Sequence, residues 1–170
     1  MSKKVAILVT NRVEDIELTN PVQHLEEAGH SVELLNADGP MEITGNKGGK
    51  FKIEKNFDEV APEDYDALLV PGGFSPDLLR INPKNAEFAA HFIKEQKPVF
   101  SICHGPQFLI DTDLIKGYEL TSFVSVRTDL KNAGAIVKDA EVIVDRNLVT
   151  SRTPDDLEAF NRELLKLLEA

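Results

Sequence analysis

The stretch Lys97-Pro-Val-Phe-Ser-Ile-Cys-His-Gly-Pro-Gln107, KPVFSICHGPQ, contains the single cysteine of the chain and indicates how the surrounding residues fold. Its apolar half, up to Ile102, is typical of a buried parallel strand, with a proline near the tolerated start. A helix is predicted to begin near Pro106. The chain must therefore turn sharply between strand and helix, and such a turn can present the Cys103 side chain outward as a nucleophile elbow.

The neighbours of Cys103 favour an activated thiol over a structural one. Gly105 allows the turn to close, and the start of the new helix points free N–H groups and a positive dipole end toward the sulfur. Both features favour thiolate, which is the reactive form. A free cysteine is also often a small buried hydrophobic residue. The position of Cys103 after a strand and before His-Gly-Pro makes the nucleophile the stronger interpretation.

His104 is a candidate general base or acid, an interface residue or a passive neighbour. Adjacent side chains on a turn diverge, so a Cys–His pair requires favourable backbone geometry. A zinc site is a weaker alternative, because the other three histidines have no ligand spacing and there is no second cysteine. The sequence therefore predicts no metal and no cofactor.

Apolar runs and helical patterns alternate along the rest of the chain. The predicted strands cover residues 5–9, 32–35, 65–70, 97–102, 118–126, 136–144 and 148–151. The predicted helices cover 21–29 and about 84–95, with a closing helix that opens at Pro154 and buries Leu157, Phe160, Leu164 and Leu168. Residues 41–56, which include GNKGG, are expected to form an excursion or β-hairpin. The alternation predicts one α/β domain over residues 1–170, with helices around a mostly parallel sheet.

Composition and charge narrow the classes of partner. The chain has 170 residues, of which 42% are hydrophobic and 28% charged, as in an ordinary globular protein. Its net charge of −10 argues against nucleic acid and anionic membranes as partners. No apolar run approaches the roughly 20 residues of a membrane span. One cysteine excludes an internal disulfide, so a reducing, cytoplasmic location is expected.

Two further segments follow predicted strands, at the sheet edge where sites of open α/β folds form. Glu14, Asp15 and Glu17 come after the first strand. They are either a solvated acidic helix start or the source of a carboxyl that hydrogen-bonds the thiol, has a raised pKa and titrates with it as a coupled pair. Gly72 and Gly73 follow another strand and either permit a turn or expose N–H donors for an oxyanion.

Together these elements resemble the PfpI family, within the DJ-one/PfpI superfamily. The resemblance covers the whole chain and rests on NRVEDIEL, HLEEAGH, YDALLVPGG, KPVFSICHGPQ, LKNAGA and TSRTPDDL. It implies a flavodoxin-like three-layer sandwich, with Cys103 as nucleophile and Glu17 as the carboxyl on its sulfur. It also implies Glu14 as a second acid, with oxyanion donors at the backbone of Gly73 and His104.

The resemblance further implies that the site lies near a subunit interface. In PfpI-type proteases an acid from a neighbouring subunit completes a Cys-His-acid triad, and Asp77 stands at that position, so a homodimer or higher oligomer is expected. Asp77 is shorter than the Glu it replaces. Phe74 stands where a protease-type member carries Arg, and Phe123 replaces a Tyr or His of the pocket lining.

Three functions share this activated thiol. The first is an enzyme that acts on reactive carbonyls or early glycation adducts, of the glyoxalase III or protein deglycase type, with Glu17 and His104 moving protons. The second is an intracellular cysteine peptidase that uses Cys103, His104 and Asp77. The third is a non-enzymatic redox sensor or chaperone of the stress response, in which Cys103 oxidises to a sulfinate.

Overall fold

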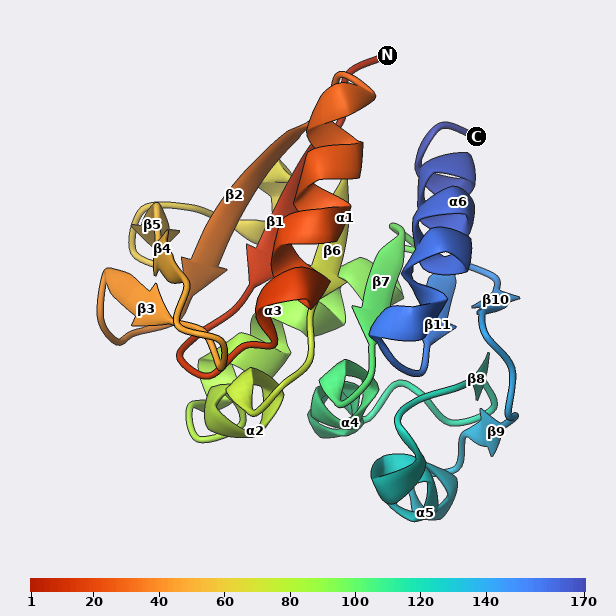
Figure 1. Cartoon of the computed structure of the whole chain (residues 1–170). Helices are drawn as coiled ribbons and strands as arrows, with labels where there is room; N and C mark the ends of the chain where they lie inside the picture. Colours follow the sequence, from red (N-terminus) through yellow and green to blue (C-terminus); the bar gives the residue numbers. More distant parts are fainter.

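A seven-stranded sheet runs through the centre of the molecule, as a computed structural model of residues 1–170 shows (Figure 1). The strand order is β10-β11-β7-β6-β1-β2-β5, and every neighbouring pair is parallel except β10 with β11. The strands are β1 (Lys4–Leu8), β2 (Ser31–Asn36), β5 (Lys55–Asn56), β6 (Ala67–Val70), β7 (Val99–Ile102), β10 (Ile143–Asp145) and β11 (Leu148–Ser151). The predicted mostly parallel sheet is confirmed.

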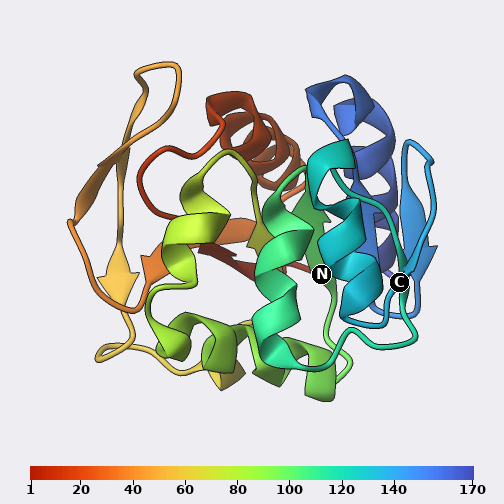
Figure 2. The same cartoon turned by 90° about the horizontal axis from the view of Figure 1, so that it is seen from below.

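Helices cover both faces of this sheet and form the two outer layers (Figure 2). Helices α1 (Asp15–Glu27) and α6 (Leu157–Leu168) pack on one face, where Leu25 and Phe160 join one apolar cluster. Helix α3 (Pro83–Lys94) packs on the other face, where Phe88 and Phe92 join a second cluster. The predicted inward side of α6 is confirmed, because all four of its expected apolar residues are buried.

The central strands have the sequence character that this arrangement requires. Every residue of β6, β7 and β11 is buried, so these strands carry continuous apolar or small residues instead of an alternating pattern. Helices follow β1 and β6 and return the chain to the next parallel strand, whereas β10 turns directly into the antiparallel β11. The continuous runs Ala67–Val70 and Val99–Ile102 could therefore be recognised directly from sequence.

Several predicted boundaries differ from the structure. Helix α1 begins six residues before Pro21, which lies inside the helix and only removes one N–H from it. The strand expected over 118–126 is reduced to β8 (Glu119–Leu120), because the Phe123 N–H donates to the Cys103 carbonyl at 2.9 Å and turns the chain toward the cysteine. The strand expected over 136–144 is interrupted, leaving β9 (Ile136–Val137), which pairs with β8, and β10.

Short elements gather at the carboxyl edge of the sheet, opposite the two chain termini (Figure 1). They include the predicted hairpin, formed by β3 (Glu42–Thr44) and β4 (Lys50–Lys52), and helices α2 (Ser75–Leu79), α4 (Gly105–Phe108) and α5 (Arg127–Asn132). The 3-10 turns are η1 (Pro62–Asp64), η2 (Leu109–Thr112), η3 (Val124–Val126) and η4 (Pro154–Asp156). None of the helices has the length and apolar character needed to cross a bilayer. The carboxyl edge is where the candidate site residues meet.

Candidate active site

Cys103 occupies the predicted sharp turn between β7 and α4. Its φ angle is +64°, a left-handed conformation that is uncommon for a residue with a side chain. Two backbone hydrogen bonds hold the turn: the Cys103 N–H donates to the Ser151 carbonyl at 3.0 Å, and the Phe123 N–H donates to the Cys103 carbonyl at 2.9 Å. The surrounding loops thus maintain a strained conformation that aims the sulfur at the site.

Glycines allow the neighbouring backbone to approach this turn. A Cβ atom added to Gly105 would overlap the Ser101 hydroxyl and the Val70 carbonyl, both of which belong to adjacent strands. A Cβ atom added to Gly72 would lie 2.5 Å from Glu17 Oε1 and 2.9 Å from Cys103 Cβ. Any larger residue at either position would therefore displace the elbow or the carboxyl beside it.

Glu17 lies beneath Cys103 and is completely buried, although it is a charged residue type in the first turn of α1. Its Oε1 accepts the Gly72 N–H at 2.9 Å, whereas its buried Oε2 has no well-aligned hydrogen-bond partner. Burial raises the pKa of Glu17 to about 8, and hydrogen bonds from Gly72 and Cys103 offset this only in part. The carboxyl therefore holds a proton at neutral pH.

The Cys103 thiol also holds its proton. Burial, followed by the charge that Glu17 carries once it is ionised, raises the pKa of the Cys103 thiol, while the His104 N–H opposes this shift. The expectation that the elbow favours thiolate was therefore wrong for the resting site. Helix α4 has only four residues, and its weak dipole does not compensate for the removal of the sulfur from water. The sulfur must lose its proton to a neighbour as it reacts.

His104 turns its ring back toward the sulfur, although adjacent side chains commonly diverge. The distance from Cys103 Sγ to His104 Nδ1 is 3.4 Å, and the other ring nitrogen, Nε2, lies 3.4 Å from Ser125 Oγ. The Phe123 ring stacks on the imidazole with centroids 4.9 Å apart and planes 22° apart. Burial lowers the pKa of His104, and the charge of Asp77 only partly opposes this. The imidazole is therefore a neutral base at neutral pH.

A cavity of about 450 Å³ opens above these groups. Seven of the predicted site residues line it, namely Glu14, Glu17, Gly73, Phe74, Cys103, His104 and Phe123. Gly72 does not line the cavity but holds Glu17 in place through its N–H. The Glu14 carboxylate reaches Lys47 Nζ at 3.2 Å. The structure thus brings together residues from three separate strand ends.

Two backbone N–H groups are suited to the predicted oxyanion role. Gly73 has a φ angle of +77°, and its N–H makes no backbone hydrogen bond. Its position is fixed on both sides, because the Glu14 N–H donates to the Gly72 carbonyl at 3.3 Å and the Phe74 N–H donates to the Arg12 carbonyl at 2.9 Å. The His104 N–H points toward the Cys103 sulfur. Donors fixed in this way can receive a developing negative charge without rearrangement.

Asp77 was predicted as a site residue but does not lie with the other residues around Cys103. It is exposed on α2, does not line the cavity and makes no side-chain hydrogen bond to His104 of its own chain. Its charge still raises the pKa of His104, so it lies within electrostatic reach. A role in completing the site from a neighbouring subunit stays a prediction.

Four further residues border the site and were not predicted from the sequence: Asn46, Thr153, Pro154 and Ser125. Asn46 belongs to the hairpin tip, which the Asp15 carboxylate holds by accepting the Lys47 and Gly49 N–H groups at 2.9 and 2.8 Å. The glycines around Asn46 signalled a tight turn. Their sequence did not indicate that the turn closes on the start of α1.

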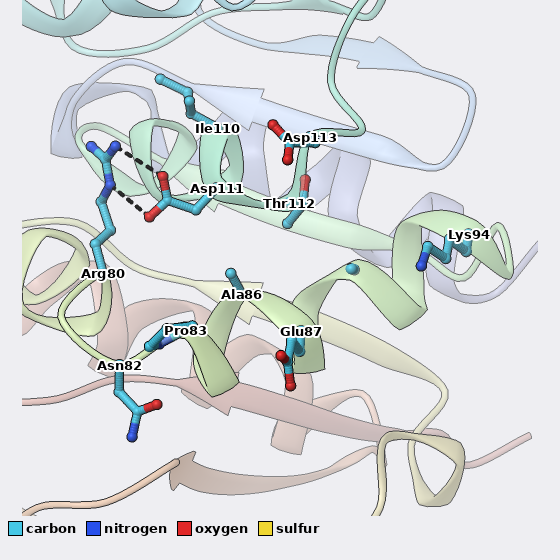
Figure 3. A pocket seen from close by; sticks show the side chains of 11 residues that line it. Arg80, Asn82, Pro83, Ala86, Glu87, Lys94, Ile110, Asp111, Thr112 and Asp113 are labelled. Atoms are coloured by element: carbon cyan, nitrogen blue, oxygen red, sulfur yellow. Dashed lines mark hydrogen bonds and ion pairs between the residues drawn. The ribbon is translucent and has the colours of Figure 1, made fainter.

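A larger cavity, of about 610 Å³, lies between α3 and η2 and contains none of the predicted site residues (Figure 3). The Arg80 guanidinium in its wall is bound to the Asp111 carboxylate at 2.9 and 3.0 Å, so its charge is already neutralised. No three His, Cys, Asp or Glu side chains of the structure lie close enough to hold a metal ion. The thiol, carboxyl and imidazole groups suited to catalysis therefore lie around Cys103 and not in this larger cavity.

Known proteins share both the sequence and this architecture. Residues 3–167 match the sequence profile of the DJ-1/PfpI family. The "Putative cysteine protease YraA" of Bacillus subtilis is 60% identical over 99% of this chain and 100% of its own length. An uncharacterised protein of Staphylococcus haemolyticus, SH1084, is 52% identical over the full length of both chains.

Solved structures show the same fold. A two-domain protein from Anabaena variabilis, with DJ-1/ThiJ/PfpI-like and ferritin-like domains, superposes with a TM-score of 0.94 and 38% identity over 98% of this chain and 48% of its own. DJ-1beta from Drosophila melanogaster superposes with a TM-score of 0.90 and 22% identity over 100% of this chain and 92% of its own. The predicted flavodoxin-like fold is confirmed, and the chain belongs to the DJ-1/PfpI family.

Proposed function

We propose that the protein is a cysteine-dependent enzyme that converts reactive carbonyls, such as glyoxal or methylglyoxal, into hydroxy acids. The observation that carries this proposal is the opposite pKa shift of the two groups beside the sulfur. The pKa of Glu17 is raised to about 8, and the pKa of His104 is lowered below its ordinary 6.5. At neutral pH the site therefore holds a protonated acid and a neutral base, which is the combination that a carbonyl addition needs.

The first step joins the cysteine to the aldehyde carbon. The thiol proton passes to His104 Nδ1 as the S–C bond forms. The carbonyl oxygen, held by the Gly73 and His104 N–H groups, takes the proton of Glu17. The product is a hemithioacetal, with His104 protonated and Glu17 ionised. Because the resting thiol and carboxyl are both protonated, this order starts from the stable form of the site.

Proton transfers then isomerise the adduct. The Glu17 carboxylate removes the proton from the former aldehyde carbon, and protonated His104 gives its proton to the adjacent carbonyl oxygen, which yields an enediol. Glu17 then returns its proton to the second carbon. His104 takes the hydroxyl proton from the carbon bonded to sulfur, and a thioester results. Water gives a proton to Glu17 as it attacks the thioester, and His104 protonates the leaving sulfur, so the 2-hydroxy acid is released and all three groups return to their starting state. Overall, one dicarbonyl and one water give one 2-hydroxy acid.

We expect the same site to act on early glycation adducts through the aldehyde that they release. A carbinolamine or hemithioacetal releases its aldehyde reversibly, so removal of free aldehyde also reverses the adduct. The cavity of about 450 Å³ accommodates a small dicarbonyl, and its mouth at Phe74 and Asn46 is exposed. Glycated proteins and peptides are therefore proposed as the sources from which the enzyme draws its carbonyl substrate.

Cys103→Ala is expected to abolish lactate formation from methylglyoxal in the absence of added thiols or amines. The sulfur is the only nucleophile of its kind in the chain, so removing it removes the covalent intermediate. The measurement is methylglyoxal consumption together with detection of D- and L-lactate. Wild-type lactate formation equal to that of Cys103→Ala would refute carbonyl turnover by this site.

Peptide hydrolysis is the second candidate, favoured by the name of the Bacillus subtilis relative and by the 3.4 Å separation of Cys103 Sγ and His104 Nδ1. A peptidase of this type needs a stable imidazolium, and Asp77 from a second copy would supply the missing carboxylate. We therefore expect any hydrolysis of a fluorogenic peptide to require a homo-oligomer and to decrease in Asp77→Asn. Peptide left intact by the assembled oligomer would remove this candidate.

A further inference from the structure

We propose that Ser125 is a positioning residue that completes a Cys103–His104–Ser125 relay within one subunit. This inference rests on the proposed function, since it concerns how the same thiol loses its proton. It assigns the third position of the relay to a hydroxyl of the same chain, without a carboxylate from a second copy. The relay links a buried sulfur to an exposed side chain on η3.

The geometry places the imidazole between two polar atoms. Nδ1 lies 3.4 Å from Cys103 Sγ, and Nε2 lies 3.4 Å from Ser125 Oγ. Phe123 stacks on the ring face, with planes 22° apart, so the ring cannot rotate without losing this contact. The Phe123 N–H is itself bonded to the Cys103 carbonyl at 2.9 Å. The backbone of the elbow therefore positions both the stacking ring and the nearby hydroxyl.

Ser125 selects the tautomer that the chemistry needs. When Nε2 carries the ring proton, it can donate to Ser125 Oγ, and the lone pair of Nδ1 then faces the thiol. As the sulfur attacks, Nδ1 takes the thiol proton. The Nε2 proton stays on the ring and continues to donate to Ser125 Oγ, so the protonated imidazole is held in place until it gives the proton from the thiol to the adduct. A serine hydroxyl both donates and accepts, so it serves the neutral and the charged ring.

The charged groups around the imidazole do not provide this contact. Glu17 of α1 and Glu14, which precedes α1, line the cavity but make no hydrogen bond to the imidazole, and the Glu14 carboxylate is bound to Lys47. Asp77 of α2 acts on His104 only through its charge. Within the chain, Ser125 is thus the one side chain with a polar atom at hydrogen-bond distance from Nε2.

The test compares Ser125→Ala with Ser125→Thr, which restores a hydroxyl, and with Thr128→Ala, which removes an exposed hydroxyl from the adjacent α5. The two readouts are kcat and KM for methylglyoxal, and the rate of Cys103 alkylation by iodoacetamide between pH 5 and 9. We expect Ser125→Ala to lower kcat and the alkylation rate near pH 7 by about three- to tenfold, as loss of one neutral hydrogen bond predicts, with KM unchanged. Ser125→Thr should recover most of both rates.

Equal rates for wild type and Ser125→Ala would overturn the relay. So would a loss that Ser125→Thr does not recover, or one that Thr128→Ala reproduces. If the wild type makes no lactate, the proposed function fails but the relay is still decided by the alkylation series, because alkylation requires only that Cys103 lose its proton. Loss of alkylation in Asp77→Asn but not in Ser125→Ala would assign the third position to the carboxylate.

Discussion

Glu17→Gln is expected to lower kcat for methylglyoxal by about 100-fold or more, the usual contribution of one proton-transferring group. The amide can still accept the Gly72 N–H, which Glu17 Oε1 now receives at 2.9 Å, so the shape of the site is retained. It cannot give a proton to the carbonyl oxygen or remove one from carbon. The measurement is steady-state lactate formation, with Cys103 alkylation as a check that the thiol stays accessible.

The same substitution has a predicted effect on stability, whose direction follows from the raised pKa. The pKa of Glu17 is about 8 in the folded chain and near its ordinary 4.5 when unfolded, so the folded state binds the extra proton between these values. The unfolding free energy therefore decreases as pH rises from about 4.5 to 8, and Glu17→Gln should remove that decrease.

The matched control is Glu14→Gln, which removes a carboxylate that lines the same cavity but is paired with Lys47. Glu14→Gln should retain the decrease in unfolding free energy that Glu17 causes, because burial is the main cause of the raised Glu17 pKa. The account of Glu17 fails if Glu17→Gln turns over methylglyoxal at the wild-type rate, or if the two glutamine variants have the same pH profile of urea unfolding.

Gly72→Ala is expected to damage both the fold and the site. The new Cβ would lie 2.5 Å from Glu17 Oε1 and 2.9 Å from both Cys103 Cβ and the Ile102 carbonyl. One of these is a backbone atom of a central strand, so relief requires movement of β7 as well as of the carboxyl. We expect a loss of about 1–3 kcal/mol in unfolding free energy, as for other overpacked sites, and a strong loss of turnover.

Gly117→Ala separates this overlap from ordinary backbone strain. Gly117 has a φ angle of +83°, and an added Cβ would meet no atom within 4 Å. Gly117→Ala should therefore lower the unfolding free energy by only about 1–2 kcal/mol, the penalty of a left-handed conformation, and leave turnover unchanged. Urea unfolding and lactate formation measured on both variants test the argument. A Gly72→Ala protein with wild-type activity would show that the close approach at Gly72 is not required.

The fold and the main site residues could be predicted because their signals are local. Continuous apolar runs identified β6 and β7, and the strand, cysteine, glycine and proline in sequence identified the elbow at Cys103. Gly72 and Gly73 were found because glycines that directly follow a buried strand permit a turn that can expose N–H donors for an oxyanion. The carboxyl ends of parallel strands then had to meet at one edge, which brought the Glu14, Asp15 and Glu17 patch near the sulfur, and the family resemblance singled out Glu17.

Features that depend on distant segments could not be predicted. Ser125 lies 21 residues beyond His104 in a segment expected to be a strand, and its turn toward the site depends on the bond from the Phe123 N–H to the Cys103 carbonyl. Asn46 reaches the cavity because Asp15 holds the hairpin tip. The protonated state of Cys103 was missed for a related reason: burial of the sulfur by surrounding loops outweighs the local effect of a four-residue helix.

The pH dependence of kcat/KM for methylglyoxal is the most direct test of the account. With His104 as base and Glu17 as acid, the profile should be bell-shaped, with an acid limb below pH 6.5 and an alkaline limb near pH 8. The alkaline limb should be missing in the residual activity of Glu17→Gln. A rate that keeps rising through pH 8 would show that thiolate formation, and not a proton held by Glu17, controls the reaction, and would contradict the mechanism proposed for this site.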